Sequence, residues 1–315
     1  MSDSKETSDE DASLAELMQE CNEANTRGDV KRAEALSLQI MAAIMSKKDQ
    51  KPSPWLACVT EAAAHEDRHE WSEAERCYRA ALDVAIQEGR DMEYKAHSDL
   101  AGFLSLMGRE EEALAEARLA ERATLQSMAV LRRRCLHALA AYERDAGNWE
   151  RARELVDEIM TTDALLQDRV GYAGALVSRA HCHTHGGDVN SAEADLNEAW
   201  KILEPYQASS IMAGHHGALA RWWRVKSEHL RLAGDLNGER DAARRSLEHT
   251  RILANATQVK RSIRLSSLEE SLKRYGEALD SAAWASEREA VERELSDVRV
   301  MLYGPTKAPP RSMAH

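Results

Sequence analysis

The chain has 315 residues, of which 43% are hydrophobic, 30% charged and only 5% aromatic, and its formal net charge is −12. This acidic charge argues against nucleic-acid binding, because a polyanion is repelled by an acidic surface. No apolar run approaches the roughly 20 residues that a membrane-spanning helix needs. Ala, Glu, Leu and Arg are abundant, and no alternating run of β-branched residues is present, which predicts an all-α fold.

The N-terminal residues 1–12 are acidic and polar, without the apolar core of a signal peptide, and we expect them to be disordered. The cysteines form an odd set of five without a Cys-x-x-Cys pair, which is typical of reduced thiols in a cytoplasmic protein. Their positions are Cys21, Cys58, Cys77, Cys135 and Cys182. We expect residues 13–303 to form the ordered unit and the proline-containing residues 304–315 to form a flexible tail.

One short pattern predicts a turn between two helices. Gly147 can adopt the left-handed conformation that ends a helix, and the side chain of Asn148 can accept a hydrogen bond from the first turn of the next helix. Ala152, Val156 and Ile159 then follow at helical spacing, so they share one face. The segment therefore indicates a helix hairpin.

This pattern recurs along the chain. The first small residue of each second helix falls about 40 residues after the previous one, except for a longer step in the sixth copy, where Glu replaces Ala. These positions are Ala33, Ala74, Ala113, Ala152, Ala192, Glu239 and Ala278. Twelve residues earlier lies another small residue, which lets two helices approach closely. Those residues are Cys21, Ala62, Ala101, Ala140, Ala180, Ser227 and Ser266.

The joints between these units have their own signals. Ser53 and Pro54 predict an N-cap and a first helical residue. The longer step places an insertion at residues 205–217, either as a longer helix or as a loop. We expect the last helix to run from about Gly276 to Tyr303. It either caps the open face of the stack or joins two chains in a short coiled coil.

The series of small residues around each turn resembles the tetratricopeptide repeat (TPR) family, over roughly residues 13–300 and with a period of about 40 residues instead of 34. The resemblance implies a right-handed superhelix of about seven helix-turn-helix repeats with a long C-terminal capping helix. Each repeat would bury its face on the next. The first helices would line a concave surface, where proteins of this family usually bind peptides or protein segments.

The resemblance also implies which positions of each first helix face the concave side. Basic and histidine residues occupy many of these positions in the middle repeats. They are Lys95, Arg134, His137, Arg144, His181, His185, Arg221, Arg224 and Arg231, and Lys260 extends the stripe. Because Arg and Lys attract carboxylates, we expect an acidic peptide or a carboxylate-bearing ligand in the groove. The alternative is that these are ordinary solvated arginines on helix faces.

Two histidine clusters raise the question of a metal. Residues 65–69, His-Glu-Asp-Arg-His, match the zinc-protease motif H-E-x-x-H, but His69 falls at a turn and no third ligand follows at helical spacing. His181 and His185 share a helix face, whereas a metal site needs three or four converging ligands. The sequence therefore favours polar groove residues over a metal site, and no cofactor is predicted.

The leading hypothesis is a cytoplasmic, non-enzymatic scaffold that binds a protein or peptide, in particular an acidic one, through its concave face. Binding to nucleic acid or to a membrane is not expected. The first alternative is a sensory module that relays ligand binding through its C-terminal helix to a partner or to the second chain of a homodimer. The less favoured alternative is a metal-dependent hydrolase that uses residues 65–69.

Overall fold

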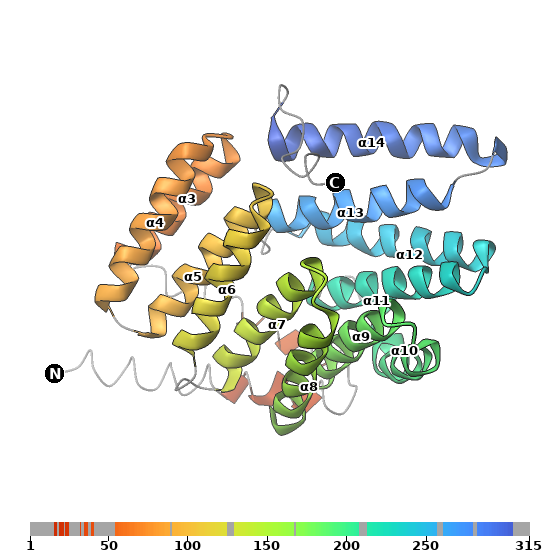
Figure 1. Ribbon diagram of the computed structural model, residues 1–315, viewed down its shortest axis with the longest axis horizontal. Coiled ribbons are helices and arrows are strands. Elements are labelled where there is room, and N and C mark those ends of the chain that lie inside the picture. The colour runs from red at the N-terminus through yellow and green to blue at the C-terminus, as the bar shows by residue number, and fades with distance from the viewer. Residues whose placement is uncertain are drawn as a thin grey trace.

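The computed structural model describes residues 54–304, except 89, 125–128, 167, 208–212, 257–260 and 280–281, and scattered helical positions between 16 and 40. Every regular element in this part of the chain is helical, which confirms the all-α prediction (Figure 1). The α-helices are α3 (Pro54–Asp67), α4 (Trp71–Glu88), α5 (Arg90–Leu106), α6 (Glu110–Ala123), α7 (Ala129–Asp145), α8 (Trp149–Leu166), α9 (Arg169–His185), α10 (Val189–Leu203), α11 (Ala213–Leu232), α12 (Leu236–Ala254), α13 (Arg261–Ala278) and α14 (Ala285–Tyr303). Two short 3-10 helices are η1 (Glu204–Tyr206) and η2 (Ala282–Trp284).

The five helix pairs from α3/α4 to α11/α12 form as the sequence predicts, because a residue with left-handed φ follows the first helix of each. Gly108, Gly147, Gly187 and Gly234 have φ between 73° and 80°, and His69 occupies the same position between α3 and α4 with φ 59°. In the Gly147 turn, the amide of Asn148 donates to the carbonyl oxygen of Glu143 at 2.8 Å. Glycine adopts this conformation without steric cost, which explains its recurrence.

The expected side-chain cap appears at other turns than the one from which it was inferred. The carboxylate of Asp188 accepts from the amide of Ser191, and that of Asp235 accepts from the amide of Gly238. The side chain of Asn148 instead donates to Glu143, at 2.8 Å between Nδ2 and Oε2. The capping role predicted for Asn148 is thus taken by aspartates in later turns.

Small residues at fixed positions let the two helices of each pair pack closely. In the four pairs from α3/α4 to α9/α10, both predicted small residues are at least 95% buried. These are Ala62 with Ala74, Ala101 with Ala113, Ala140 with Ala152, and Ala180 with Ala192. In the next pair Ser227 is fully buried, and Glu239 is 5% exposed at the position of the expected alanine. Its carboxylate lies 3.4 Å from the guanidinium of Arg274 on α13, which accounts for a buried acid there.

The last hairpin differs from the prediction. We expected a last helix from about Gly276, but α13 continues through this residue to Ala278, and α14 begins at Ala285. At the place where the other turns have a left-handed residue, this repeat has Lys273, which favours helix. The helix therefore ends later, and η2 precedes α14.

The insertion predicted at residues 205–217 includes part of the short 3-10 helix η1 and the start of the long helix α11. Pro205 lies in η1, and α11 begins at Ala213 and extends for 20 residues. Between them, residues 208–212 lie outside the described part of the chain, as do residues 1–12, Ala33, Lys260 and residues 305–315.

The two ends of the described superhelix meet. The helix pairs follow an arc from α3/α4 to α13/α14, which returns toward its start (Figure 1). The Nε2 atom of His69 lies 3.1 Å from the carbonyl oxygen of Met301 in α14, and Asp67 forms an ion pair with Arg261 of α13 at 3.3 Å. Leu106 at the end of α5 shares an apolar cluster with residues of α13 and α14. The solenoid is therefore nearly closed into a ring.

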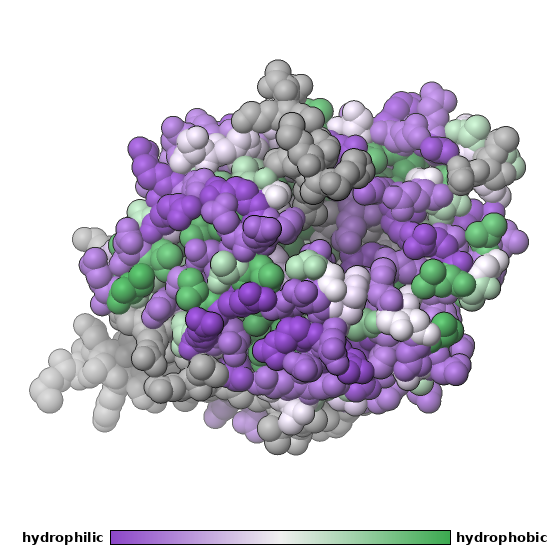
Figure 2. Space-filling model, viewed as in Figure 1, coloured by the Kyte–Doolittle hydropathy of each residue, from purple (hydrophilic) through white to green (hydrophobic). Residues whose placement is uncertain are grey.

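Helix α14 covers the last face of this ring, as the capping prediction required. Val291, Val298 and Leu302 are buried in a cluster with α13. None of the helices in the described part of the chain has the length and apolarity that crossing a bilayer requires. The face toward the viewer in Figure 2 is mostly hydrophilic, with apolar residues in small groups.

Candidate functional site

The superhelix encloses a cavity of about 670 Å³, which is within the usual range of ligand pockets. Residues of α5, α7, α8, α9, α11, α12 and α13 line it. Much of the wall consists of hydroxyl groups, from Ser105, Ser178, Ser246, Thr250, Ser262, Ser266, Ser267 and Ser271. The charged and imidazole side chains in the wall are those of His137, Arg144, Asp145, Arg221, Arg224 and Glu270. The cavity wall thus mixes polar with apolar groups and contains more basic than acidic side chains.

Two of the three arginines in the cavity are paired with carboxylates. Arg224 of α11 forms an ion pair with Glu270 of α13. Burial would lower the pKa of Arg224, but the charges of Glu270 and Glu228 raise it above its ordinary value. Arg144 of α7 lies 3.5 Å from Asp145. The positive charges of these two residues are therefore largely compensated within the protein.

Arg221 is different, because it has no hydrogen-bond or ion-pair partner among the described residues. Its side chain is accessible to water within the cavity, and its Nη2 lies 3.6 Å from the position that a Cβ on Gly174 would occupy. The surrounding protein, together with the charges of Arg224 and Arg144, lowers its pKa to about 10. The guanidinium remains charged at neutral pH, so it places an uncompensated positive charge in the cavity.

His137 lies in the same wall, on α7. Burial and the charges of Arg221 and Arg133 lower its pKa to about 4. At neutral pH its imidazole is therefore uncharged, with one nitrogen that donates and one that accepts. It adds a polar group beside Arg221 without adding charge.

The other predicted groove residues lie outside the cavity wall. Lys95 places its ammonium group 5.5 Å from the centre of the Trp55 ring. Arg134 and Arg231 are exposed on α7 and at the end of α11. The prediction that these three contribute to ligand binding stays untested, and their places favour solvent or packing roles.

His181 and His185 form a separate cluster with residues of neighbouring helices. The Nε2 atom of His181 lies 2.9 Å from Oε2 of Glu228 on α11, and Nε2 of His185 lies 3.7 Å from the same oxygen. The His185 ring stacks on Trp149, with 4.1 Å between ring centres. Sequence reasoning identified the two histidines but could not place Glu228 beside them.

Residues 65–69 do not have the geometry of the zinc-protease motif. Helix α3 ends at Asp67, so His69 lies in the turn and points to Met301 instead of joining His65 on one helix face. The carboxylate of Glu66 is buried and accepts a hydrogen bond from Tyr78 at 2.9 Å. It is therefore not placed as the general base that the motif requires.

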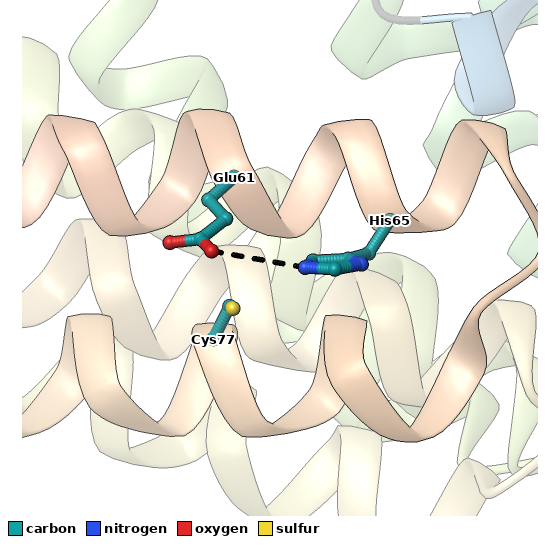
Figure 3. Close-up of side chains that lie close together, drawn as sticks. All are labelled: Glu61, His65 and Cys77. Atoms are coloured by element: carbon teal, nitrogen blue, oxygen red, sulfur yellow. Dashed lines mark ion pairs between the residues drawn. The ribbon is translucent and has the colours of Figure 1, made fainter.

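Another set of ligand-type groups lies nearby, shown in Figure 3. His65 points toward Glu61, at 3.8 Å, and Cys77 of α4 faces both. However, Nδ1 of His65 also lies 2.6 Å from Glu70. Burial raises the pKa of the Cys77 thiol, which disfavours the thiolate that a metal would bind. We regard this set as structural. No disulfide joins the cysteines of the described residues.

No protein-family model and no curated protein sequence matches the chain. Solved structures do resemble it. The Rap protein complexed with Competence and Sporulation Factor is 12% identical, with a TM-score of 0.51, and the match covers 92% of this chain and 98% of that one. BtubC (BKLC) from P. vanneervenii is 16% identical over 84% of this chain and 98% of its own, with a TM-score of 0.45.

A Podosopora anserina kinesin light chain protein with TPR-like repeats is 13% identical and has a TM-score of 0.38, over 65% of this chain and 94% of its own. At these identities the likeness speaks for the fold alone, and of these three structures the Rap protein has a TM-score above 0.5. Three features of the structure support the same fold. The helices are paired, small residues are buried at a repeat of about 40 residues, and residues with left-handed φ form the turns. The chain therefore has the superhelical fold of the tetratricopeptide repeat proteins, as its sequence predicted.

Proposed function

We propose that this protein is a non-enzymatic scaffold that holds an acidic segment of a partner protein or peptide in the cavity. The observation that carries the proposal is the uncompensated guanidinium of Arg221, in a cavity whose other arginines have carboxylate partners. A carboxylate is the group that an arginine binds best, through two parallel hydrogen bonds. A carboxylate of the bound segment would supply the negative charge that balances Arg221.

The form of the cavity favours a short segment over a folded domain. Its volume of about 670 Å³ is that of a small-ligand pocket. Ser262 and Ser266 of α13 add hydroxyl groups to the wall that can donate to and accept from a peptide backbone. Because packed helices already hold these groups in place, binding does not require the protein to become ordered. A protein of the same fold, Rap, is seen in complex with Competence and Sporulation Factor, which gives a precedent for complex formation by this fold.

Pools of fluorescent hexapeptides test this proposal. One pool is rich in Asp and Glu, a second has Asn and Gln at the same positions, and a third has Lys and Arg. Fluorescence anisotropy measures their binding to the full chain and to Arg221→Gln. We expect the acidic pool to bind best and Arg221→Gln to weaken it about tenfold, because a charge-assisted hydrogen bond contributes about 1.5–3 kcal/mol.

Arg134→Gln is the matched control, because Arg134 is exposed on α7 and does not line the cavity. It should leave binding unchanged. Equal binding of the acidic and amide pools, or equal losses in the two variants, would contradict the proposal.

The nearly closed ring favours a second candidate, in which binding is relayed to a partner or a second copy of the chain. Helix α14 contacts the α3/α4 turn through Met301 and His69, so a change in superhelix curvature would alter this contact. Hydrogen exchange at residues 66–71 and in α14, measured with and without the acidic pool, would detect the change. Unaltered exchange at both ends with a saturating pool would favour the passive scaffold.

A further inference from the structure

Three residues from two helices bring metal-binding atoms together outside the cavity wall. His181 and His185 lie one turn apart on α9, so they share a face, and α11 brings the carboxylate of Glu228 to both. One ligand atom from each residue lies within 4.8 Å of the other two. From this geometry we infer that His181, His185 and Glu228 form a zinc-binding site.

The distances are close to those that zinc requires. Zn–N bonds of about 2.0–2.1 Å and Zn–O bonds of about 2.0–2.2 Å separate tetrahedral ligands by roughly 3.3 Å. The two histidine nitrogens lie 2.9 and 3.7 Å from Oε2 of Glu228, on either side of that value. Small side-chain rotations therefore suffice to place all three around one ion.

The hydrogen bonding of Glu228 leaves its shared oxygen available. Oε2 is buried, and despite its proximity to His181 it accepts no well-directed hydrogen bond from the described residues. A buried carboxylate oxygen without such a bond is costly. A cation bound between this oxygen and the imidazoles would remove that cost.

Three arginines lie near the site and would repel a cation if they were uncompensated. Each has an acidic partner of its own. Arg224 pairs with Glu270, Arg274 with Glu239 at 3.4 Å and Glu277 at 3.6 Å, and Arg144 with Asp145 at 3.5 Å. Most of the positive charge of these arginines is thus balanced by carboxylates other than Glu228.

The surroundings hold the ligand set in place and leave one side open. Trp149 stacks on His185 with only 4° between the ring planes, which orients the imidazole. The side chain of His185 is 37% exposed, so water can complete the coordination. Two histidines, one carboxylate and a water form a known four-ligand zinc set, and nitrogen and oxygen ligands together suit zinc. The set at Glu61, His65 and Cys77 is weaker, because Glu70 engages His65 and the thiol is protonated.

The test is a ZnCl₂ titration of the full chain after dialysis against a chelator. Calorimetry measures affinity, and native mass spectrometry counts the ions bound. We expect one zinc ion per chain and a loss of more than tenfold in affinity for His185→Ala and Glu228→Gln. His185 is exposed and Glu228→Gln preserves shape, so both variants should fold, which circular dichroism checks. Cobalt in place of zinc should give the intense visible absorption of tetrahedral coordination.

Two controls separate this site from its neighbours. His183→Ala removes an adjacent histidine that is not part of the set, and His65→Ala removes the central ligand of the other cluster. Both should bind zinc as the native chain does. The inference is overturned if the native chain binds no zinc, if His185→Ala binds it unchanged, or if zinc is lost in His65→Ala instead. None of these outcomes depends on peptide binding.

Discussion

The Nε2 atom of His69 lies 3.1 Å from the carbonyl oxygen of Met301, a residue 232 positions further along the chain. This contact joins the turn between α3 and α4 to the last helix. His69 is also the one non-glycine residue with positive φ in the described part of the chain. Its ring packs edge-on against Trp71, with 5.3 Å between ring centres, and lies against Gly304. A side chain at a strained turn position is thus explained by its role in closing the ring.

Replacement of His69 tests this role. We expect His69→Ala to lower the free energy of unfolding by about 1–2 kcal/mol, because the variant keeps the strained backbone and loses the hydrogen bond. His69→Gly should lower the free energy of unfolding by less than His69→Ala does, because glycine removes roughly 1 kcal/mol of backbone strain. Urea denaturation measures both. A His69→Ala variant as stable as the native chain, or a glycine variant less stable than the alanine variant, would contradict the interpretation.

Glu239 offers a second test, because alanine is the residue that the repeat pattern predicts there. We expect Glu239→Ala to destabilise the protein by about 3 kcal/mol, since it removes a carboxylate from the largely buried Arg274. The double variant Glu239→Ala with Arg274→Met should recover most of this loss. Thermal and urea unfolding provide the measurement. If the single variant is more stable than the native chain, the repeat pattern outweighs the ion pair and the prediction is wrong.

Stability should depend on pH through two histidines. The pKa of His137 is lowered to about 4 by burial and by Arg221 and Arg133, although Asp168 opposes this. The pKa of His249 is lowered to about 4 by burial, His216 and Arg245. Above pH 6.5 both residues are neutral in the folded and unfolded chain. Between pH 6.5 and 4 the unfolded chain binds protons first, so stability falls as pH falls, by up to about 1.4 kcal/mol per pH unit per histidine.

The variant His137→Asn isolates one of these contributions. Its stability should fall less steeply between pH 6.5 and 4 than that of the native chain, in urea denaturation at several pH values. His185→Asn, which replaces an exposed histidine, serves as the control in metal-free buffer. A slope that is the same in His137→Asn as in the native chain would show that His137 titrates normally.

The helix pairs could be predicted from sequence because their signals are local. A residue suited to left-handed φ, followed at helical spacing by small residues, is enough to place each turn from Gly108 to Gly234. The last turn was misplaced because the small residues continue there while Lys273 replaces the left-handed residue, so the helix runs on to Ala278. The end of α13 was therefore set by the lack of a residue suited to left-handed φ, and the spacing of small residues did not set it.

The cavity could be predicted only in part. His137, Arg144, Arg221 and Arg224 stand at positions that the resemblance to the TPR family implies for the concave side, and they do line the cavity. Their partners do not follow, because Glu270 and Glu228 come from other helices, at distances set by the rotation between repeats. The contact between His69 and α14 could not be predicted for the same reason, because it depends on the rotations between repeats summed over the whole superhelix. Arg134 and Arg231 fit the periodicity but fall outside the part of the helices that faces the cavity.

The most direct measurement is the position of a bound acidic peptide, determined by photo-crosslinking and mass spectrometry. A hexapeptide from the acidic pool, with a benzophenone side chain, is irradiated on the full chain and the modified residues are mapped. We predict crosslinks on the cavity sides of α7, α11 and α13, and their loss in Arg221→Gln. Crosslinks confined to α4, α6 and α10, which contribute no residue to the cavity wall, would contradict binding inside the superhelix.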